Sequence, residues 1–248
     1  MDISKFEPKN RLQPIEAMRA FRALLADGER TEYVFVIIQA LSNGDSEMNA
    51  KKLQKSESGR SLLAEKPQIL DVLQDSDRLA AMPLGSLGRT YYEFTKREQI
   101  TADGLVEASD VKRVEAPKSV DGEWMSKRMR DVHDLWHVLS GYGRDGLGEL
   151  CLLGFSYAQT KARGIGFIAA MGAIQARKWG PDGGKLPSIK AVWEGYRLGK
   201  KAAWLPAVEF EKLMERNVIE LRRELNIGEH KTYDDVLVAF NAPAPIPV

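Results

Sequence analysis

The chain has little of what defines a secreted, nucleic-acid-binding or membrane-spanning protein. Its 248 residues include one cysteine, Cys151, which excludes an internal disulfide and fits a reducing compartment. Lys+Arg (36) and Asp+Glu (35) nearly balance. We therefore expect no nucleic-acid partner, because such binders carry a basic excess or patch. The longest uncharged apolar stretch, Gly164 to Gln175, is shorter than the roughly 20 residues of a transmembrane helix.

The N-terminal residues contain no apolar signal segment, so we expect a cytoplasmic protein, with peripheral contact at the inner face of the membrane still open. Hydrophobic residues make up 44% and charged residues 29% of the chain, as in ordinary globular proteins with a sizeable core.

Helical spacing of apolar residues dominates the sequence and predicts an all-α fold. One run, Tyr33-Val-Phe-Val-Ile-Ile, is β-branched, but no hairpin partner lies near it, so it is interpreted as a buried helix. We expect one domain over residues 1–248, with a flexible Pro-rich tail over 241–248. The predicted helices cover residues 15–25, 33–41, 45–66 (in one or two pieces), 67–73, the surroundings of 91–94, 102–110, 122–141, 146–179, 187–203 and 206–226.

Two of the three histidines stand four residues apart within one predicted helix, with an aspartate between them. His133 and His137 therefore share a helix face, and Asp134 lies at its edge. Apolar residues surround them, so the face is expected to be half-buried, where unpaired polar groups are costly. The alternative to a functional site is that the two histidines are ordinary residues, either on the surface or hydrogen-bonded in the core. The third histidine, His230, lies in a polar segment and is expected to be exposed.

A glycine-rich stretch, residues 141–148, follows this helix and predicts a tight connection to the next one. Glu149 then comes twelve residues after His137. If the two helices fold back as an antiparallel central pair, the Glu149 carboxylate faces the histidines. Imidazole and carboxylate ligands suit Zn²⁺, and also Mn²⁺ or Fe²⁺. The zinc-protease pattern is excluded because Asp134 stands where its glutamate would be, and no histidine lies upstream for an HD-type phosphohydrolase.

The spacing His133-Asp134-x-x-His137-x11-Glu149 resembles the signature of the Coq4 family of ubiquinone biosynthesis proteins. Three further segments, within residues 84–91, 193–199 and 205–225, are similar to family elements, although Phe210 stands where members often have Trp. The resemblance covers about residues 80–227. It implies a helical, often dimeric fold, a divalent metal held by His133, Asp134, His137 and Glu149, and a cavity for a lipid. Zinc is expected first, with manganese, iron or magnesium as alternatives.

The resemblance also implies chemistry at C1 of a polyprenylated 4-hydroxybenzoate-type precursor, where carboxylate gives way to hydroxyl by a metal-dependent decarboxylase-type reaction. The expected partners are this aromatic lipid, other quinone-biosynthesis proteins and a second copy of the chain. The substrate contacts proposed are Tyr91, Trp136, Phe155 and Phe167, although core packing explains each equally well.

Two other readings of the site remain open. One is a non-catalytic, metal-containing scaffold that binds a polyprenyl lipid. The other is an unrelated metal-dependent hydrolase, for which no general base beyond the ligands is apparent. A closed set of four protein ligands would favour the scaffold, and an open coordination position an enzyme.

Overall fold

The computed structural model describes residues 11–26, 32–41, 44–100, 119–180 and 183–240. These residues form helices and no strand, and one isolated bridge, Ser86 with Asn217, is their β-type pairing. The all-α prediction is confirmed. The helices are α1 (Pro14–Ala26), α2 (Glu32–Leu41), α3 (Asp45–Leu53), α4 (Glu57–Glu65), α5 (Ile69–Gln74), α6 (Ser76–Ala81), α7 (Leu87–Glu98), α9 (Val120–Asp131), α10 (His133–Ser140), α11 (Gly146–Thr160), α12 (Arg163–Ala176), α13 (Ser188–Lys201), α14 (Val218–Glu224) and α15 (Lys231–Ala239).

The predicted helix over 102–110 and the predicted tail over 241–248 lie outside the described residues. The expected domain boundaries, residues 1–248, stay a prediction. Within the described part of the chain, no helix is both long and apolar enough to cross a membrane.

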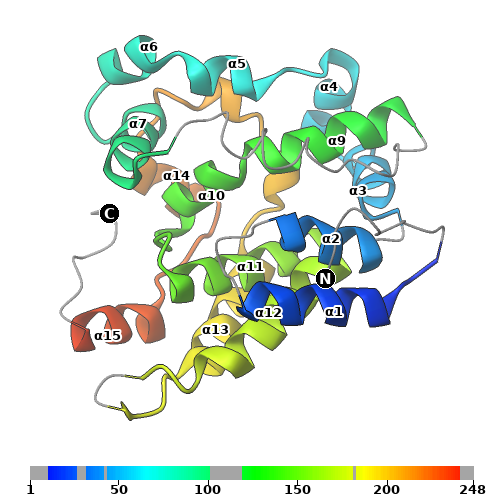
Figure 1. The fold of residues 1–248 in the computed structure, drawn as a ribbon. Helices are drawn as coiled ribbons and strands as arrows, with labels where there is room; N and C mark the ends of the chain where they lie inside the picture. Colours follow the sequence, from blue (N-terminus) through cyan, green and yellow to red (C-terminus); the bar gives the residue numbers. More distant parts are fainter. Residues whose placement is uncertain (1–10, 27–31, 42–43, 101–118, 181–182, 241–248) are drawn as a thin grey trace.

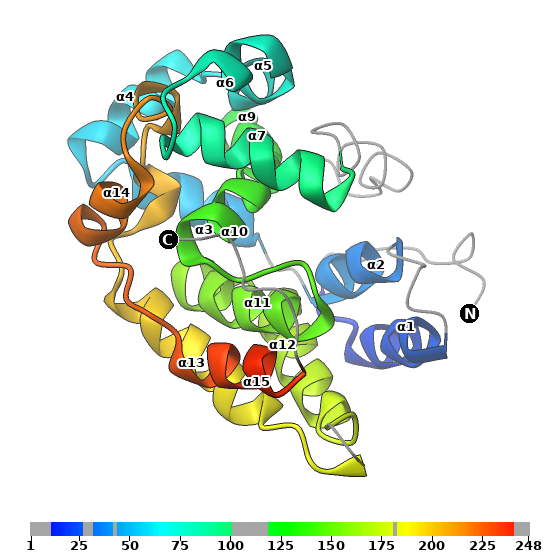
Figure 2. The same ribbon diagram turned by 90° about the vertical axis from the view of Figure 1, so that its left-hand side faces the viewer.

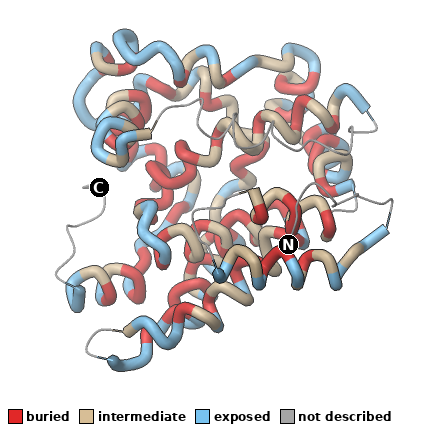
Figure 3. Tube along the Cα trace, in the orientation of Figure 1, coloured by how far each residue is buried: buried red, intermediate tan, exposed pale blue. Residues whose placement is uncertain are grey.

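The helices form two layers with α10 between them (Figures 1 and 2). One layer holds α5, α6, α7 and α9, and the other holds α1, α2, α11, α12 and α13. Helix α11 packs chiefly on α13 and α12, and only lightly on α10. The main core cluster includes residues of α7, α10, α11 and α13, and a smaller cluster joins α1 and α2 to α12. Figure 3 shows how burial concentrates along the central helices, and α10 is buried from Asp134 through Ser140.

Two long predicted helices are each divided in two. The first ends at Asp131, and α10 begins anew after a turn at Val132, whose N–H faces the carbonyls of Arg128 and Arg130. The second breaks after Thr160. The Thr160 hydroxyl donates to the carbonyl of Ser156 and accepts from the N–H of Ala162, so it competes with helical pairing. Lys161 then adopts a left-handed conformation (φ 58°).

The predicted helix over 206–226 is also wrong in its first half. Two 3-10 turns, Leu205–Ala207 and Phe210–Lys212, replace it, and α14 begins only after Asn217, whose side chain accepts from the N–H groups of Ile219 and Glu220. Helix α15 was not predicted. The expectation that His230 is exposed is wrong, since it is 7% exposed and its ring stacks on Tyr142 with centroids 4.4 Å apart.

Candidate metal centre

The two histidines come from α10, a short helix whose end is fixed by Gly141. This glycine adopts a left-handed conformation (φ +80°), and its N–H bonds to the carbonyl of His137. A Cβ at this position would lie 2.9 Å from His230 Nε2 and 3.1 Å from an Arg222 nitrogen. Only glycine meets both demands without strain. The chain therefore turns sharply at Gly141, one residue after α10 ends.

The third candidate ligand comes from the first turn of α11. Asp145 is the N-cap residue, and its Oδ1 accepts from the N–H groups of Leu147 (3.1 Å) and Gly148 (3.0 Å). A Cβ at Gly148 would lie 2.2 Å from the carbonyl oxygen of Gly143, so the connection closes too tightly for a larger residue. This start of the helix places Glu149 opposite α10.

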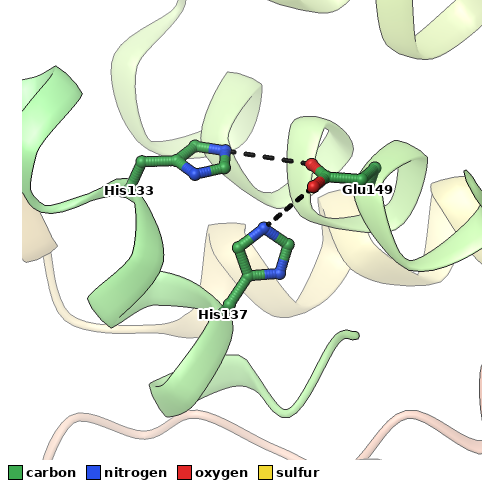
Figure 4. A group of neighbouring side chains, drawn as sticks. All are labelled: His133, His137 and Glu149. Carbon is green, nitrogen blue, oxygen red and sulfur yellow. Dashed lines mark ion pairs between the residues drawn. The ribbon is translucent and has the colours of Figure 1, made fainter. Parts of the chain in front are cut away.

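The side chains of His133, His137 and Glu149 converge as the sequence predicts (Figure 4). Nε2 of His137 lies 3.4 Å from Oε1 of Glu149, and Nε2 of His133 lies 4.0 Å from Oε2. One ligand atom from each residue falls within 4.8 Å of the others. Two ligands of one tetrahedral zinc are about 3.4 Å apart, so small side-chain rotations would bring the three onto one ion.

The orientation of His137 suits a metal ligand. Its Nδ1 lies 2.9 Å from the backbone carbonyl of Tyr142, and because a carbonyl only accepts, Nδ1 carries the proton. In the neutral ring, Nε2 then presents a lone pair. This atom is buried and has no hydrogen-bond partner. The Phe94 ring stacks on the imidazole, with centroids 5.7 Å apart. A buried acceptor without a donor is costly, and a cation would satisfy it.

Asp134 lies beside the trio. Its Oδ1 is 3.2 Å from Nδ1 of His133, the ring nitrogen that does not face Glu149. A carboxylate in this position orients a metal-binding histidine from behind. The structure thus brings three of the four predicted ligands together and gives the fourth a contact with His133, because neighbouring residues on one helical turn do not face the same point.

The electrostatics of the site favour a cation. Burial alone would raise the pKa values of Asp134 and Glu149, but hydrogen bonds from the histidines and their positive charge when protonated outweigh it, so both carboxyls have lowered pKa values. Burial alone would lower the pKa of His133, yet the Asp134 hydrogen bond and the charges of Glu149 and Asp134 raise it overall. The Glu149 and His133 side chains are 32% and 27% exposed, so the trio opens toward solvent on that side.

The four aromatic residues predicted to contact substrate fall into two groups. Tyr91, Trp136 and Phe155 are buried in the main core, where the Trp136 and Phe155 rings meet at 6.2 Å. Phe167 belongs to the smaller cluster and contacts Phe21, with ring centroids 5.7 Å apart. Trp136 precedes His137 in α10. The structure brings three of the four into one core and places Phe167 in another.

Sequence reasoning missed three groups at the site. They are the Tyr142 carbonyl, the Phe94 ring and Arg144, whose Nε lies 3.7 Å from Oε1 of Glu149. Arg144 could have been found, because it is a cation in the predicted connection between the ligand-bearing helices. The other two depend on the tight turn and on the packing of α7 against α10, which sequence spacing does not reveal.

Comparisons with known proteins identify the family of the chain. Residues 12–231 match the family model described as coenzyme Q (ubiquinone) biosynthesis protein Coq4, and the chain belongs to this family. It is 30% identical over 181 residues to the mitochondrial ubiquinone biosynthesis protein COQ4 homolog of Danio rerio, covering 72% of this chain and 62% of that protein. It is 29% identical over 182 residues to mitochondrial COQ4 of Yarrowia lipolytica, covering 72% and 65%. The chain thus matches less than two thirds of the length of these two relatives.

A crystal structure of a Nostoc punctiforme protein named for ubiquinone biosynthesis is similar in fold. It superposes with a TM-score of 0.64 over 88% of this chain and 100% of that chain, at 22% sequence identity. At this identity the likeness shows the shared helical fold.

Proposed function

We propose that His133, His137 and Glu149 bind one divalent metal ion, with Asp134 orienting His133 from behind, and that the chain uses this site in ubiquinone biosynthesis. The observation that carries the proposal is the buried Nε2 of His137, which lacks a hydrogen-bond partner and faces the Glu149 carboxylate at 3.4 Å. Two imidazoles and a carboxylate suit zinc first, with manganese, iron or magnesium as alternatives.

The geometry favours an enzyme over a scaffold. A zinc ion held by these three protein ligands would keep a position open, as in catalytic zinc sites, whereas structural sites are closed by four. Asp134 is engaged with His133 Nδ1, so it does not close the set. The open side is the partly exposed one, where His133 and Glu149 reach solvent. A metal-containing scaffold that only binds a polyprenyl lipid has no need of this opening.

The proposed reaction replaces the carboxylate at C1 of a polyprenylated 4-hydroxybenzoate-type ring by hydroxyl. The C1–carboxylate bond breaks as CO₂ leaves, and a C1–oxygen bond forms. With O₂ as the oxidant, the carboxylic acid, one O₂ and one water give the phenol, CO₂ and hydrogen peroxide. A divalent ion held by His133, His137 and Glu149 would supply Lewis-acid stabilisation of negative charge on a ring oxygen.

The chain's own groups prepare the site for such a substrate. Asp134 and the Tyr142 carbonyl contact the Nδ1 atoms of the two imidazoles, and the Nε2 atoms of both rings face Glu149. Arg144, which is 36% exposed beside Glu149, is a cation at the solvent-facing side of the trio, and its charge suits an anionic ring substituent. Contacts of Tyr91, Trp136, Phe155 and Phe167 with the lipid stay predictions. So do a homodimer, other quinone-biosynthesis proteins as partners, and a cytoplasmic location with peripheral membrane contact.

The test is elemental analysis of the purified protein beside a Glu149→Gln variant. Glu209→Gln is a matched control, because that carboxylate is similarly exposed (24% against 32%) but pairs with Lys212 away from the site. We expect about one metal per chain in the wild type and the control, and loss in Glu149→Gln. Turnover of a polyprenyl hydroxybenzoate with CO₂ release should follow metal content. A wild type that stays metal-free after reconstitution contradicts the metal site, and a metal-loaded protein without turnover favours the scaffold.

A further inference from the structure

The connection between the two ligand-bearing helices is held by residues from the C-terminal end of the described chain. Tyr233, in the first turn of α15, is 1% exposed. Its hydroxyl accepts a hydrogen bond from the backbone N–H of Gly143 at 3.0 Å and donates one to Oδ2 of Asp145. One hydroxyl therefore ties down two points of the segment that runs from α10 to α11.

Both of these points control a ligand. Gly143 follows Tyr142, whose carbonyl accepts a hydrogen bond from Nδ1 of His137. Asp145 caps α11 with its other carboxylate oxygen, and the capped turn carries Glu149. The position of Tyr233 thus affects His137 through Gly143 and Tyr142, and it affects Glu149 through Asp145.

The packing around this segment leaves little freedom. A Cβ at Gly143 would lie 2.8 Å from the Tyr233 hydroxyl. His230, just before α15, stacks on the Tyr142 ring at 4.4 Å, and the Tyr233 ring meets the same ring edge-on at 5.3 Å. Tyr142 is therefore fixed through its side chain as well as through its neighbour Gly143.

We propose that Tyr233 is a positioning residue for the metal centre. It fixes the 141–145 connection. His137 Nδ1 then keeps its hydrogen bond to the Tyr142 carbonyl, and Glu149 stays opposite Nε2 of His137. The match to the family model ends at residue 231, so Tyr233 lies just outside the matched region. The inference rests on the proposed metal binding for its functional meaning, but the positioning itself exists in the metal-free protein.

The experiment compares Tyr233→Phe with the wild type. The variant keeps the buried ring and removes both hydrogen bonds of the hydroxyl. Ser188→Ala is the matched control, because it also removes a buried hydroxyl bond (to the Ala173 carbonyl, 2.6 Å), between α12 and α13. Tyr233→Phe loses two hydrogen bonds and Ser188→Ala loses one, so both are expected to be somewhat less stable. Stability alone therefore does not distinguish positioning from a merely structural role.

The first readout is the imidazole ¹⁵N spectrum of the metal-free protein, in which only three histidines contribute. In the wild type and in Ser188→Ala, His137 should show a single tautomer with the proton on Nδ1. In Tyr233→Phe we expect a mixture of tautomers. A His137 spectrum unchanged in a folded Tyr233→Phe variant overturns the proposal, whether or not the protein binds a metal.

The second readout is metal affinity measured by competition with a chelator. Loss of a group hydrogen-bonded to a metal ligand typically weakens metal binding about 10–100-fold. Because Tyr233 acts on the ligands through the 141–145 connection, we expect a loss near the lower end of that range for Tyr233→Phe and none for Ser188→Ala. Asp145→Ser keeps a capping oxygen while losing the partner of Tyr233. The double variant should therefore bind metal about as weakly as Tyr233→Phe alone. If the losses of metal affinity in the two single variants add up in the double variant, Tyr233 and Asp145 do not act together, which contradicts the proposal. A wild type that binds no metal counts against the proposed function, and the ¹⁵N spectra then still test the positioning role.

Discussion

Oδ1 of Asp134 lies 3.2 Å from Nδ1 of His133, while Nε2 of the same ring faces Glu149 at 4.0 Å. The two nitrogens of one imidazole thus have different partners. A carboxylate on Nδ1 fixes the ring orientation and makes Nε2 a better electron donor. In the proposed metal centre, Asp134 would therefore act through His133.

We predict that Asp134→Asn weakens metal binding about 10–100-fold without abolishing it, because the ligand set is kept while its support is lost. His133→Ala, which removes a ligand, should lose far more. Chelator competition measures both. Asp131→Asn is the control, since that carboxylate pairs with Arg130 instead. If Asp134→Asn binds no metal at all, Asp134 is itself a ligand, and unchanged affinity would remove it from the site.

Much of this site could be predicted from the sequence, for a physical reason. The separation of His133 and His137 matches one helical turn, so their shared face follows from helix geometry alone. The glycines in the connection predict a tight turn, which limits where Glu149 can lie relative to the histidines. The position of Asp134 was harder to predict, because a residue at the edge of a helix face can point toward the site or along a neighbouring ring.

The fold class could be predicted and several helix boundaries could not. Periodicity continues across Val132 and across Thr160, but side chains and turns at these points compete with helical hydrogen bonds. His230 shows the same limit. Its sequence neighbours are polar, yet it is covered by the ring of Tyr142, which lies 88 residues earlier in the chain. Long-range packing of this kind leaves no local signal.

The single thiol should be unreactive in the folded protein. Cys151 is fully buried, and burial, together with the negative charges of Asp145 and Glu194, raises the pKa of its thiol. The thiolate is the reactive form, so labelling with a thiol reagent at pH 8 should be slow in native protein and fast in urea. The labelled fraction, read by mass spectrometry, should therefore follow global unfolding. Rapid labelling of native protein would contradict the burial of this residue.

Removing the partner of a buried cation should cost far more than removing that of an exposed one. Arg128 is 2% exposed in its side chain and forms two bonds to the Glu211 carboxylate, at 2.6 and 3.1 Å. We expect Glu211→Ala to lower the free energy of unfolding by about 3–5 kcal/mol, because it leaves a buried charge unpaired. Glu224→Ala breaks an exposed pair with Arg216 and should cost about 0–1 kcal/mol. Urea unfolding measures both, and equal effects would contradict the buried pair.

Gly141→Ala tests the turn that ends α10. The substitution forces a left-handed conformation on an L-residue, at about 1–2 kcal/mol, and places a Cβ 2.9 Å from His230 Nε2. Gly146→Ala is the control, because nothing lies within 4 Å of its Cβ position and the residue starts α11. There, alanine reduces the freedom of the unfolded chain and should be neutral or stabilising by up to about 1 kcal/mol. Urea unfolding of the two variants should therefore shift in opposite directions or leave only Gly141→Ala weakened. Equal stabilities would contradict the left-handed turn, and with it the sharp reversal that brings Glu149 toward the histidines.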